Sequence, residues 1–335
     1  MLPAPFARRR FLQGLAGAAL TLAGPGIKPA HALSLSHTGP LDAAAYRSLR
    51  RYAGTPFGHV AYIGQGPADG RAALDALFLH GFPLNSFQWR GAIDRLSAHR
   101  RCLAPDFLGL GFSRVPEGQS VTPTVQAKML AAFLDAVGAD VVDVVANDSG
   151  GAVAQLFAIH YPSRVRSLLL TNCDTEPDSP PPAMEPVLEL ARAGTYADQW
   201  LAPWVRDKAL ARSAEGLGGM TFSDPTQPSD EAIDYYLGPL VSSPRRKDLV
   251  HAYTLGLAPN PLAGVEKELR RVTVPTRIVW GMADTIFNPA GADYLASMLP
   301  NCQGVRRLPQ AKLFFPEEYP DVIAEEAKRL WGVSA

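Results

Sequence analysis

From residue 57 to residue 331 the chain repeatedly follows a short apolar stretch with a longer stretch of helical period. Short runs of this kind suit buried strands, and the longer ones suit amphipathic helices. Strands that alternate with helices are typical of a parallel sheet covered on both faces. The pattern therefore predicts an α/β fold, with strands at 57–63, 72–79, 102–105, 141–146, 165–172, 276–280 and 305–308.

The alternation is interrupted once, by a long segment without a clear strand. Residues 174–182 are acidic and rich in proline, and residues 186–264 have a helical pattern with turns. A helical block inserted between two strands is expected to lie over the sheet edge where ligands bind. The predicted division is a lead-in at 33–56, an α/β core at 57–173 and 265–335, and a helical cap at 174–264.

The first 32 residues have the layout of a bacterial signal peptide. Arg8-Arg9-Arg10-Phe11-Leu12 precedes a mild apolar run at 14–24, and Ala30-His31-Ala32 offers small residues at a cleavage site. The paired arginines resemble those of twin-arginine signals. The apolar run is short against the roughly 20 residues of a bilayer span, which favours a cleaved signal over an uncleaved anchor. The sequence therefore predicts a periplasmic or secreted protein without stable membrane insertion.

Composition narrows the range of partners. Lys plus Arg and Asp plus Glu number 32 each, so nothing in the charge indicates binding to nucleic acid. Three widely spaced cysteines predict no disulfide framework, and no Cys/His spacing resembles a zinc site. We expect a small-molecule substrate as partner and neither a metal nor a cofactor, while the sequence predicts no oligomeric state.

A tight strand-to-helix junction is predicted at Val144-Val145-Ala146-Asn147-Asp148-Ser149-Gly150-Gly151. A nucleophile elbow needs small residues on either side of the nucleophile. Ala146 and Gly150 lie two positions before and after Asp148, whereas Ser149 would have an asparagine as one flank. Asp148 is therefore favoured as the nucleophile over Ser149. An aspartate here would also cap the following helix, whose N-terminus stabilises a negative charge.

Four segments in this order resemble the α/β-hydrolase family over residues 57–331: 79–83, 104–113, 144–151 and 278–284. The resemblance implies an α/β-hydrolase fold with a cap. It further implies an oxyanion hole formed by the backbone N–H groups of Phe82 and Ser149. His80 is expected to hold its loop by hydrogen bonds. Asp284 is the favoured acid of the catalytic triad, and Asp174 is the alternative.

Within this family, an aspartate at the elbow resembles the haloalkane dehalogenases, haloacid dehalogenases and epoxide hydrolases. In the chemistry that this implies, Asp148 attacks an sp³ carbon and forms an ester, and a histidine then activates water to hydrolyse it. The segment 308–320 aligns with the family's histidine segment, and Leu313 holds the position of the histidine. Among the other histidines, only His251 near the end of the cap is a candidate to reach the site.

Two further departures bear on the substrate. Haloalkane dehalogenases usually carry Trp directly after the nucleophile, where this chain has Ser149. They usually carry Asn in the loop that corresponds to residues 79–83, where this chain has Phe82. Epoxide hydrolases use cap tyrosines as acids, and Tyr235 or Tyr236 could serve here, with Tyr236 favoured. These departures favour an epoxide or another substrate over a haloalkane.

The leading hypothesis is an exported hydrolase that attacks an epoxide, carbon–halogen or ester bond of an apolar small molecule through Asp148. One alternative is a lyase, isomerase or other cofactor-free enzyme that uses Asp148 as a base. A second is a ligand-binding protein without turnover, and a third is a serine esterase acting through Ser149.

Overall fold

The computed structural model describes residues 41–67 and 74–334. The predicted signal peptide and residues 33–40 of the predicted lead-in lie outside these described residues. All of the described residues belong to one compact unit. Within them, no helix combines the length and the apolar character needed to cross a membrane.

Eight strands form one sheet in the order β1-β2-β4-β3-β5-β6-β7-β8. β1 pairs antiparallel with β2 and β2 with β4, while every other pair is parallel. The predicted α/β fold with a mostly parallel sheet is therefore confirmed. The strands are β1 (Arg51–Thr55), β2 (Gly58–Gln65), β3 (Asp75–Leu79), β4 (Arg101–Pro105), β5 (Val142–Asp148), β6 (Val165–Cys173), β7 (Thr276–Gly281) and β8 (Cys302–Leu308).

The first strand and the helix before it have no counterpart in the sequence prediction, which has only a lead-in there. Only the central residue of β1, Ala53, is buried, so this edge strand lacks the apolar run of an interior strand. It is held by antiparallel pairing with β2, from Arg51 opposite Tyr62 to Thr55 opposite Gly58. Pairing with a neighbour, rather than its own composition, makes this segment a strand.

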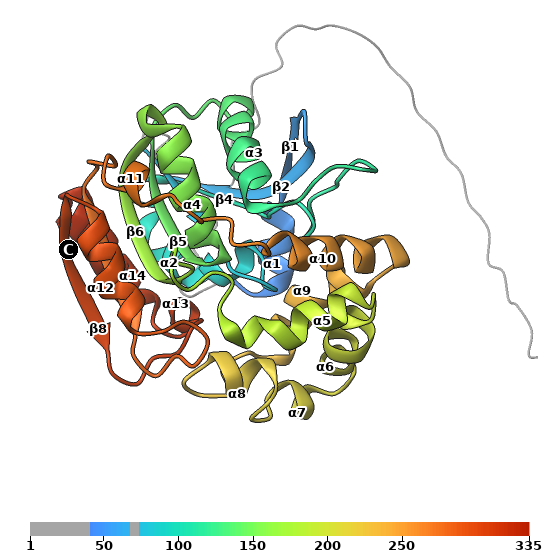
Figure 1. Cartoon of the computed structure of the whole chain (residues 1–335). Coiled ribbons are helices and arrows are strands. Elements are labelled where there is room, and N and C mark those ends of the chain that lie inside the picture. Colours follow the sequence, from blue (N-terminus) through green and yellow to red (C-terminus); the bar gives the residue numbers. More distant parts are fainter. Residues whose placement is uncertain (1–40, 68–73, 335) are drawn as a thin grey trace, which may run out of the picture. The chain divides into compact units, whose positions relative to one another are not determined.

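Two apolar cores lie on the two faces of the sheet. Successive residues of β5 alternate between them, since Val144 and Ala146 belong to the larger core and Val145 to the smaller one. Figure 1 shows α3 and α4 lying together against the sheet. The larger core contains side chains of α3 (Pro123–Ala136), α4 (Ser149–His160) and α12 (Ala290–Met298), and the smaller core those of α2 (Arg90–Leu96) and α14 (Pro320–Trp331).

Residues 185–256, between β6 and β7, are mostly helical, and Figure 1 shows these helices gathered on one side of the molecule. Local sequence defines their starts: Ser229 and Ser243 accept hydrogen bonds from backbone N–H groups of the first turns of α9 and α10. The helices are α5 (Glu185–Arg192), the π-helical turn η4 (Ala197–Leu201), α6 (Ala202–Arg206), α7 (Lys208–Ala211), α8 (Leu217–Thr221), α9 (Asp230–Val241) and α10 (Pro244–Gly256).

The remaining helices are short and connect the sheet to its surroundings. They are α1 (Ala43–Leu49), the 3₁₀ turns η1 (Ser86–Trp89), η2 (Pro162–Arg164) and η3 (Pro182–Met184), α11 (Glu266–Leu269) and α13 (Phe315–Glu318).

The carboxyl ends of four parallel strands meet at one edge of the sheet, which is where ligands bind in folds of this kind. β3 leads into the loop that contains Phe82, and β5 ends at Asp148. Asp174 directly follows β6, and Asp284 lies three residues beyond β7. The fold therefore brings the sequence-predicted loop and carboxylates to the same edge.

Candidate active site

Asp148 lies at the apex of a strand-to-helix turn that has no intervening loop. β5 ends at this residue, α4 begins at the next one, and the backbone has φ 56° and ψ −135°. Among the described residues, Asp148 is the only one other than glycine with a positive φ. Such a conformation costs on the order of 1–3 kcal/mol and tends to occur at functional sites. The structure thus places Asp148, not Ser149, at the apex.

The glycines around this turn are required by close approach. A Cβ atom on Gly150 would lie 2.5 Å from the carbonyl oxygen of His80, and one on Gly81 would lie 2.6 Å from the Cβ of Asp148. Both distances are shorter than real Cβ contacts allow. The small residue two positions after Asp148 therefore lets α4 start directly against the loop that follows β3.

The two backbone N–H groups predicted to form an oxyanion hole both donate hydrogen bonds to the carboxylate of Asp148. Its Oδ1 accepts hydrogen bonds from the N–H of Phe82 at 2.7 Å and from the N–H of Ser149 at 2.5 Å. No described residue donates a well-formed hydrogen bond to the other oxygen, Oδ2. Asp148 is 7% exposed, and burial raises its pKa to about 6, an effect that the two N–H donors and the side chain of Ser149 oppose.

His80 fixes the loop that supplies one of these donors. Its Nε2 accepts a hydrogen bond from the N–H of Phe107 at 3.0 Å, while Nδ1 lies 2.9 Å from the carbonyl oxygen of Gly81. Nδ1 therefore donates, and the ring is neutral. Burial lowers the pKa of His80, in keeping with this neutral form. These hydrogen bonds agree with the predicted role of His80, which is to hold its loop in place.

Two further buried aspartates interact electrostatically with Asp148. Asp284 accepts hydrogen bonds from the side-chain amide of Asn172 at 2.7 Å and the N–H of Ile286 at 2.9 Å, and burial raises its pKa to about 6. Asp174 accepts one from the hydroxyl of Ser179 at 2.7 Å, and burial, then the charge of Asp148, raises its pKa to about 7. Both candidate acids are thus close to Asp148, and Asp284 is the more firmly oriented.

Leu313 and His251 occupy positions with no polar contact to Asp148. The side chain of Leu313 is 1% exposed within the larger core, and its backbone carbonyl accepts a hydrogen bond from Asn147. His251 uses its Nε2 to accept from the N–H of Ala197 at 3.1 Å, inside the helical block. Of the histidines in residues 41–67 and 74–334, none is hydrogen-bonded to Asp148, Asp174 or Asp284.

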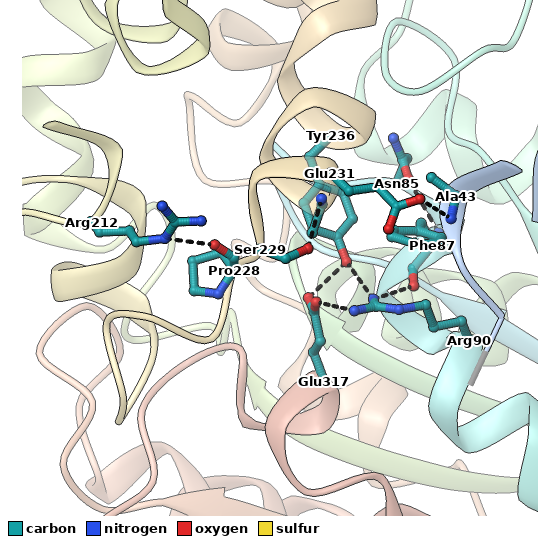
Figure 2. Close-up of polar contacts among 11 residues, drawn as sticks. Ala43, Asn85, Phe87, Arg90, Arg212, Pro228, Ser229, Glu231, Tyr236 and Glu317 are labelled. Carbon is teal, nitrogen blue, oxygen red and sulfur yellow. Dashed lines mark hydrogen bonds and ion pairs between the residues drawn. The ribbon is translucent and has the colours of Figure 1, made fainter. Parts of the chain in front are cut away.

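Tyr236, the predicted cap acid, is bonded to an ion pair. Its hydroxyl donates to Glu317 at 2.7 Å and accepts from Arg90 at 3.2 Å, and Arg90 pairs with Glu317 at 2.7 Å. Figure 2 shows the three side chains converging from α9, α13 and α2. The structure shows no contact between this hydroxyl and Asp148, so Tyr236 instead ties the helical block to the core.

Two other tyrosines of the helical block lie beside Asp148, and sequence reasoning did not single them out. The rings of Tyr196 and Tyr253 stack with Phe82 at centroid distances of 5.9 and 5.6 Å. The hydroxyl of Tyr253 lies 3.1 Å from the Oγ of Ser149. Burial, and after it the charge of Asp148, raises the pKa of both phenols. Both therefore stay protonated at neutral pH and can donate hydrogen bonds.

Across the described ranges, no group of three or more His, Cys, Asp or Glu side chains is arranged to hold a metal ion. The site around Asp148 consists of carboxyl groups, phenols and backbone N–H donors. It combines a carboxylate held by two N–H donors, two further carboxyl groups and two protonated phenols, surrounded by buried aromatic side chains.

Comparison with known proteins supports the same family. The family model of the alpha/beta hydrolase fold matches residues 77–319. Haloalkane dehalogenase 2 of Mycobacterium tuberculosis (strain ATCC 25618 / H37Rv) is 28% identical over 287 residues, which cover 84% of this chain and 95% of the relative.

Two solved structures share the fold over nearly their whole length. The haloalkane dehalogenase DbeA from Bradyrhizobium elkani has a TM-score of 0.69 and 24% identity, covering 84% of this chain and 97% of that one. The epoxide hydrolase CorEH has a TM-score of 0.69 and 21% identity, covering 84% and 98%. Together with the sheet order and the turn at Asp148, these matches show that the chain belongs to the α/β-hydrolase family, in the branch that resembles haloalkane dehalogenases and epoxide hydrolases.

Proposed function

We propose that this hydrolase attacks an apolar small molecule through the carboxylate of Asp148, with an epoxide as the favoured substrate and carbon–halogen or ester bonds as the other candidates. The observation that carries the proposal is the environment of Asp148. One oxygen is held by two backbone N–H groups, and the other is left without a well-formed hydrogen bond. A carboxylate fixed in this way presents one oxygen for attack in a defined direction.

In the first step, Oδ2 of Asp148 forms a bond to an sp³ carbon of the substrate. The C–O bond of the epoxide breaks, its electron pair stays on the oxygen, and that oxygen takes up a proton. Tyr196 and Tyr253 are the hydroxyl groups placed to supply this proton, because both lie against Phe82 beside Asp148. A halide would need no proton, so the two phenols favour the epoxide.

In the second step, water attacks Cγ of the Asp148 ester, the Cγ–Oδ2 bond breaks, and the diol leaves with Oδ2 after that oxygen takes up a proton. The carboxylic acid left on Asp148 returns a proton to the tyrosine that lost one in the first step. The negative charge develops on Oδ1, which the N–H groups of Phe82 and Ser149 already surround. Water must lose a proton to a base, and the position of the family's histidine is held by Leu313. Asp174 is the carboxyl group that we assign to that task, because burial, the largest cause, keeps its pKa raised even after the ester has removed the charge of Asp148.

A second candidate function follows from the same groups. A buried carboxylate with a pKa of about 6 also suits a base that removes a proton from carbon, as a lyase or isomerase requires. The absence of a hydrogen bond between Asp148 and any described histidine favours this alternative, because proton abstraction needs no ester hydrolysis.

Mass spectrometry of the intact protein tests the choice between these functions. After incubation with styrene oxide, we expect a mass increase equal to one molecule of epoxide, and peptide mapping should locate it on Asp148. Acylation of Ser149 by 4-nitrophenyl acetate, without labelling of Asp148 by the epoxide, would identify a serine esterase. Unlabelled protein with unchanged styrene oxide would contradict the attack of Asp148 on carbon.

We further propose that the protein acts outside the cytoplasm, on the basis of the paired arginines and the small residues at 30–32. The secreted form is expected to begin near Leu33. Fractionation of expressing cells, with N-terminal sequencing of the periplasmic protein, provides the measurement. Replacement of Arg8 and Arg9 by lysine should retain the protein in the cytoplasm, and equal export of both forms would overturn the proposal.

A further inference from the structure

An open groove lies apart from Asp148, where α1, α9 and α10 meet the segment from Gly111 to Val115. Its volume is about 530 Å³, within the range of small-molecule sites. None of the residues that contact the Asp148 carboxylate lines it. The side chains that decide its character are Arg47, Arg114, Arg245, Arg246, Phe112 and Tyr235.

The groove has a local excess of positive charge in a chain whose total charge is balanced. Within the described part of the chain, no carboxylate lies within 4.0 Å of any of its four lining arginines, although eleven other arginines there form such pairs. The one acidic lining residue, Asp234, is paired with Lys208. None of the four arginines therefore forms an ion pair with a described carboxylate, although the charge of Asp106 acts on Arg246 at longer range.

Backbone carbonyl groups hold two of these arginines in place. Arg246 donates to the carbonyl oxygens of Gly111, Ser113 and Pro239, and Arg245 donates to those of Val115 and Pro116. Carbonyl oxygens orient a guanidinium but do not neutralise it. Arg246 is half-buried, and the charge of Asp106 partly offsets the cost of that burial. Arg47, Arg114 and Arg245 are exposed, so their N–H groups can donate to an anionic ligand.

Aromatic rings lie among these charges. The guanidinium of Arg50 lies 3.3 Å from the centre of the Phe112 ring, and Phe112 meets Tyr235 edge to face at 5.1 Å. Arg47 lies 6.0 Å from the centre of the Tyr235 ring. The groove thus offers apolar surface beside its N–H donors, which is the combination that recognises an aromatic or otherwise apolar anion.

We propose that this groove binds a small organic anion, in which a carboxylate, sulfonate or phosphate group is attached to an apolar body. The oxyanion lies among the guanidinium groups, which present planar sets of N–H donors, and the apolar body lies against Phe112 and Tyr235. This site is separate from the one around Asp148 and does not depend on its chemistry.

The test uses naphthalene-2-sulfonate as the probe and 2-naphthalenemethanol as its uncharged analogue, in isothermal titration calorimetry at low salt. We expect one binding site for the sulfonate, an affinity for the alcohol at least about tenfold weaker, and an affinity for the sulfonate that falls as salt rises. Equal affinity for the two probes would overturn the proposal.

Arg47→Gln and Arg245→Gln together should weaken sulfonate binding by about tenfold or more, since hydrogen bonds to charged groups contribute that much. Arg271→Gln, which removes an exposed arginine outside the groove that also lacks a carboxylate partner among the described residues, is the matched control and should bind as wild type. Unchanged thermal melting confirms that the double variant is folded. Wild-type affinity in that folded variant would show that the sulfonate binds elsewhere.

Discussion

Replacement of Asp148 by asparagine is expected to lower kcat/KM for epoxide hydrolysis by about 10⁴-fold or more, because a neutral amide cannot attack carbon as a carboxylate does. The variant should remain folded, since an amide oxygen can still accept the hydrogen bonds of Phe82 and Ser149. Steady-state kinetics with styrene oxide provides the measurement, and intact mass confirms that the asparagine has not reverted to aspartate by deamidation.

Ser149→Ala is the matched control for this variant. Ser149→Ala keeps the backbone N–H that donates to Oδ1 of Asp148 and removes only the hydroxyl, which lies 3.1 Å from that of Tyr253 and helps to lower the pKa of Asp148. We therefore expect this change to cost less than about tenfold in kcat/KM. If instead Ser149→Ala abolished activity and Asp148→Asn spared it, the nucleophile would be Ser149.

The asparagine variant should also be more stable than wild type at pH 8, and not at pH 3. Burial raises the pKa of Asp148 from its usual 3.8 to about 6 in the folded protein, so the fold disfavours the charged form. At pH 3 the carboxyl group is mostly protonated in both states, whereas above pH 6 the folded protein bears the full cost. The difference corresponds to about 3 kcal/mol in the free energy of unfolding. Urea denaturation at both pH values measures it, and an equal gain at both would contradict this explanation.

The second large effect is expected at Leu313. If an ester forms on Asp148 and the usual base is absent, Leu313→His should accelerate the breakdown of that ester by roughly 10²–10⁴-fold, the usual contribution of general-base catalysis. Leu313→Met changes the shape of the side chain without adding a base, so it should leave the rate nearly unchanged. Single-turnover decay of the Asp148 adduct, followed by mass, gives the rates.

The same experiment distinguishes the two candidate acids. A new histidine works only if a carboxylate orients it, as the third member of a triad does. Addition of Asp284→Asn should remove the gain from Leu313→His if Asp284 is that carboxylate, and Asp174→Asn should remove it if Asp174 is. A wild-type protein that turns over epoxide rapidly with no adduct, and is slowed by the histidine, would favour the lyase or isomerase reaction.

The features that local sequence determines were predictable. The turn at Asp148 depends on neighbours within two residues, above all Gly150, which no larger residue can replace without a clash. Asp174 and Asp284 follow the ends of apolar strands, so the alternation of strands and helices already places them at one sheet edge. For these residues, the order of strands and helices along the chain is enough to predict where they lie in the fold.

The side chains of the helical block were not predictable in this way. Tyr236 and Tyr253 both lie in cap helices, yet one is bonded to Glu317, 81 residues away, and the other lies beside Ser149, 104 residues away. Which tyrosine points toward the sheet depends on how the helices cross the core, which no local pattern encodes. The groove that contains Arg47, Arg114, Arg245 and Arg246 was not predicted for the same reason, because four separate segments of the chain line it.

The two N–H donors that hold Oδ1 of Asp148 have a consequence for how such a protein would be detected. Fluorophosphonate probes label serine hydrolases by bonding to the nucleophilic oxygen and placing a phosphoryl oxygen between these same donors. Here a negatively charged side chain fills that space, and its charge repels the electron-rich probe. If Asp148 is the nucleophile, surveys of cell extracts that count hydrolases by fluorophosphonate labelling would therefore overlook this protein even where it is abundant.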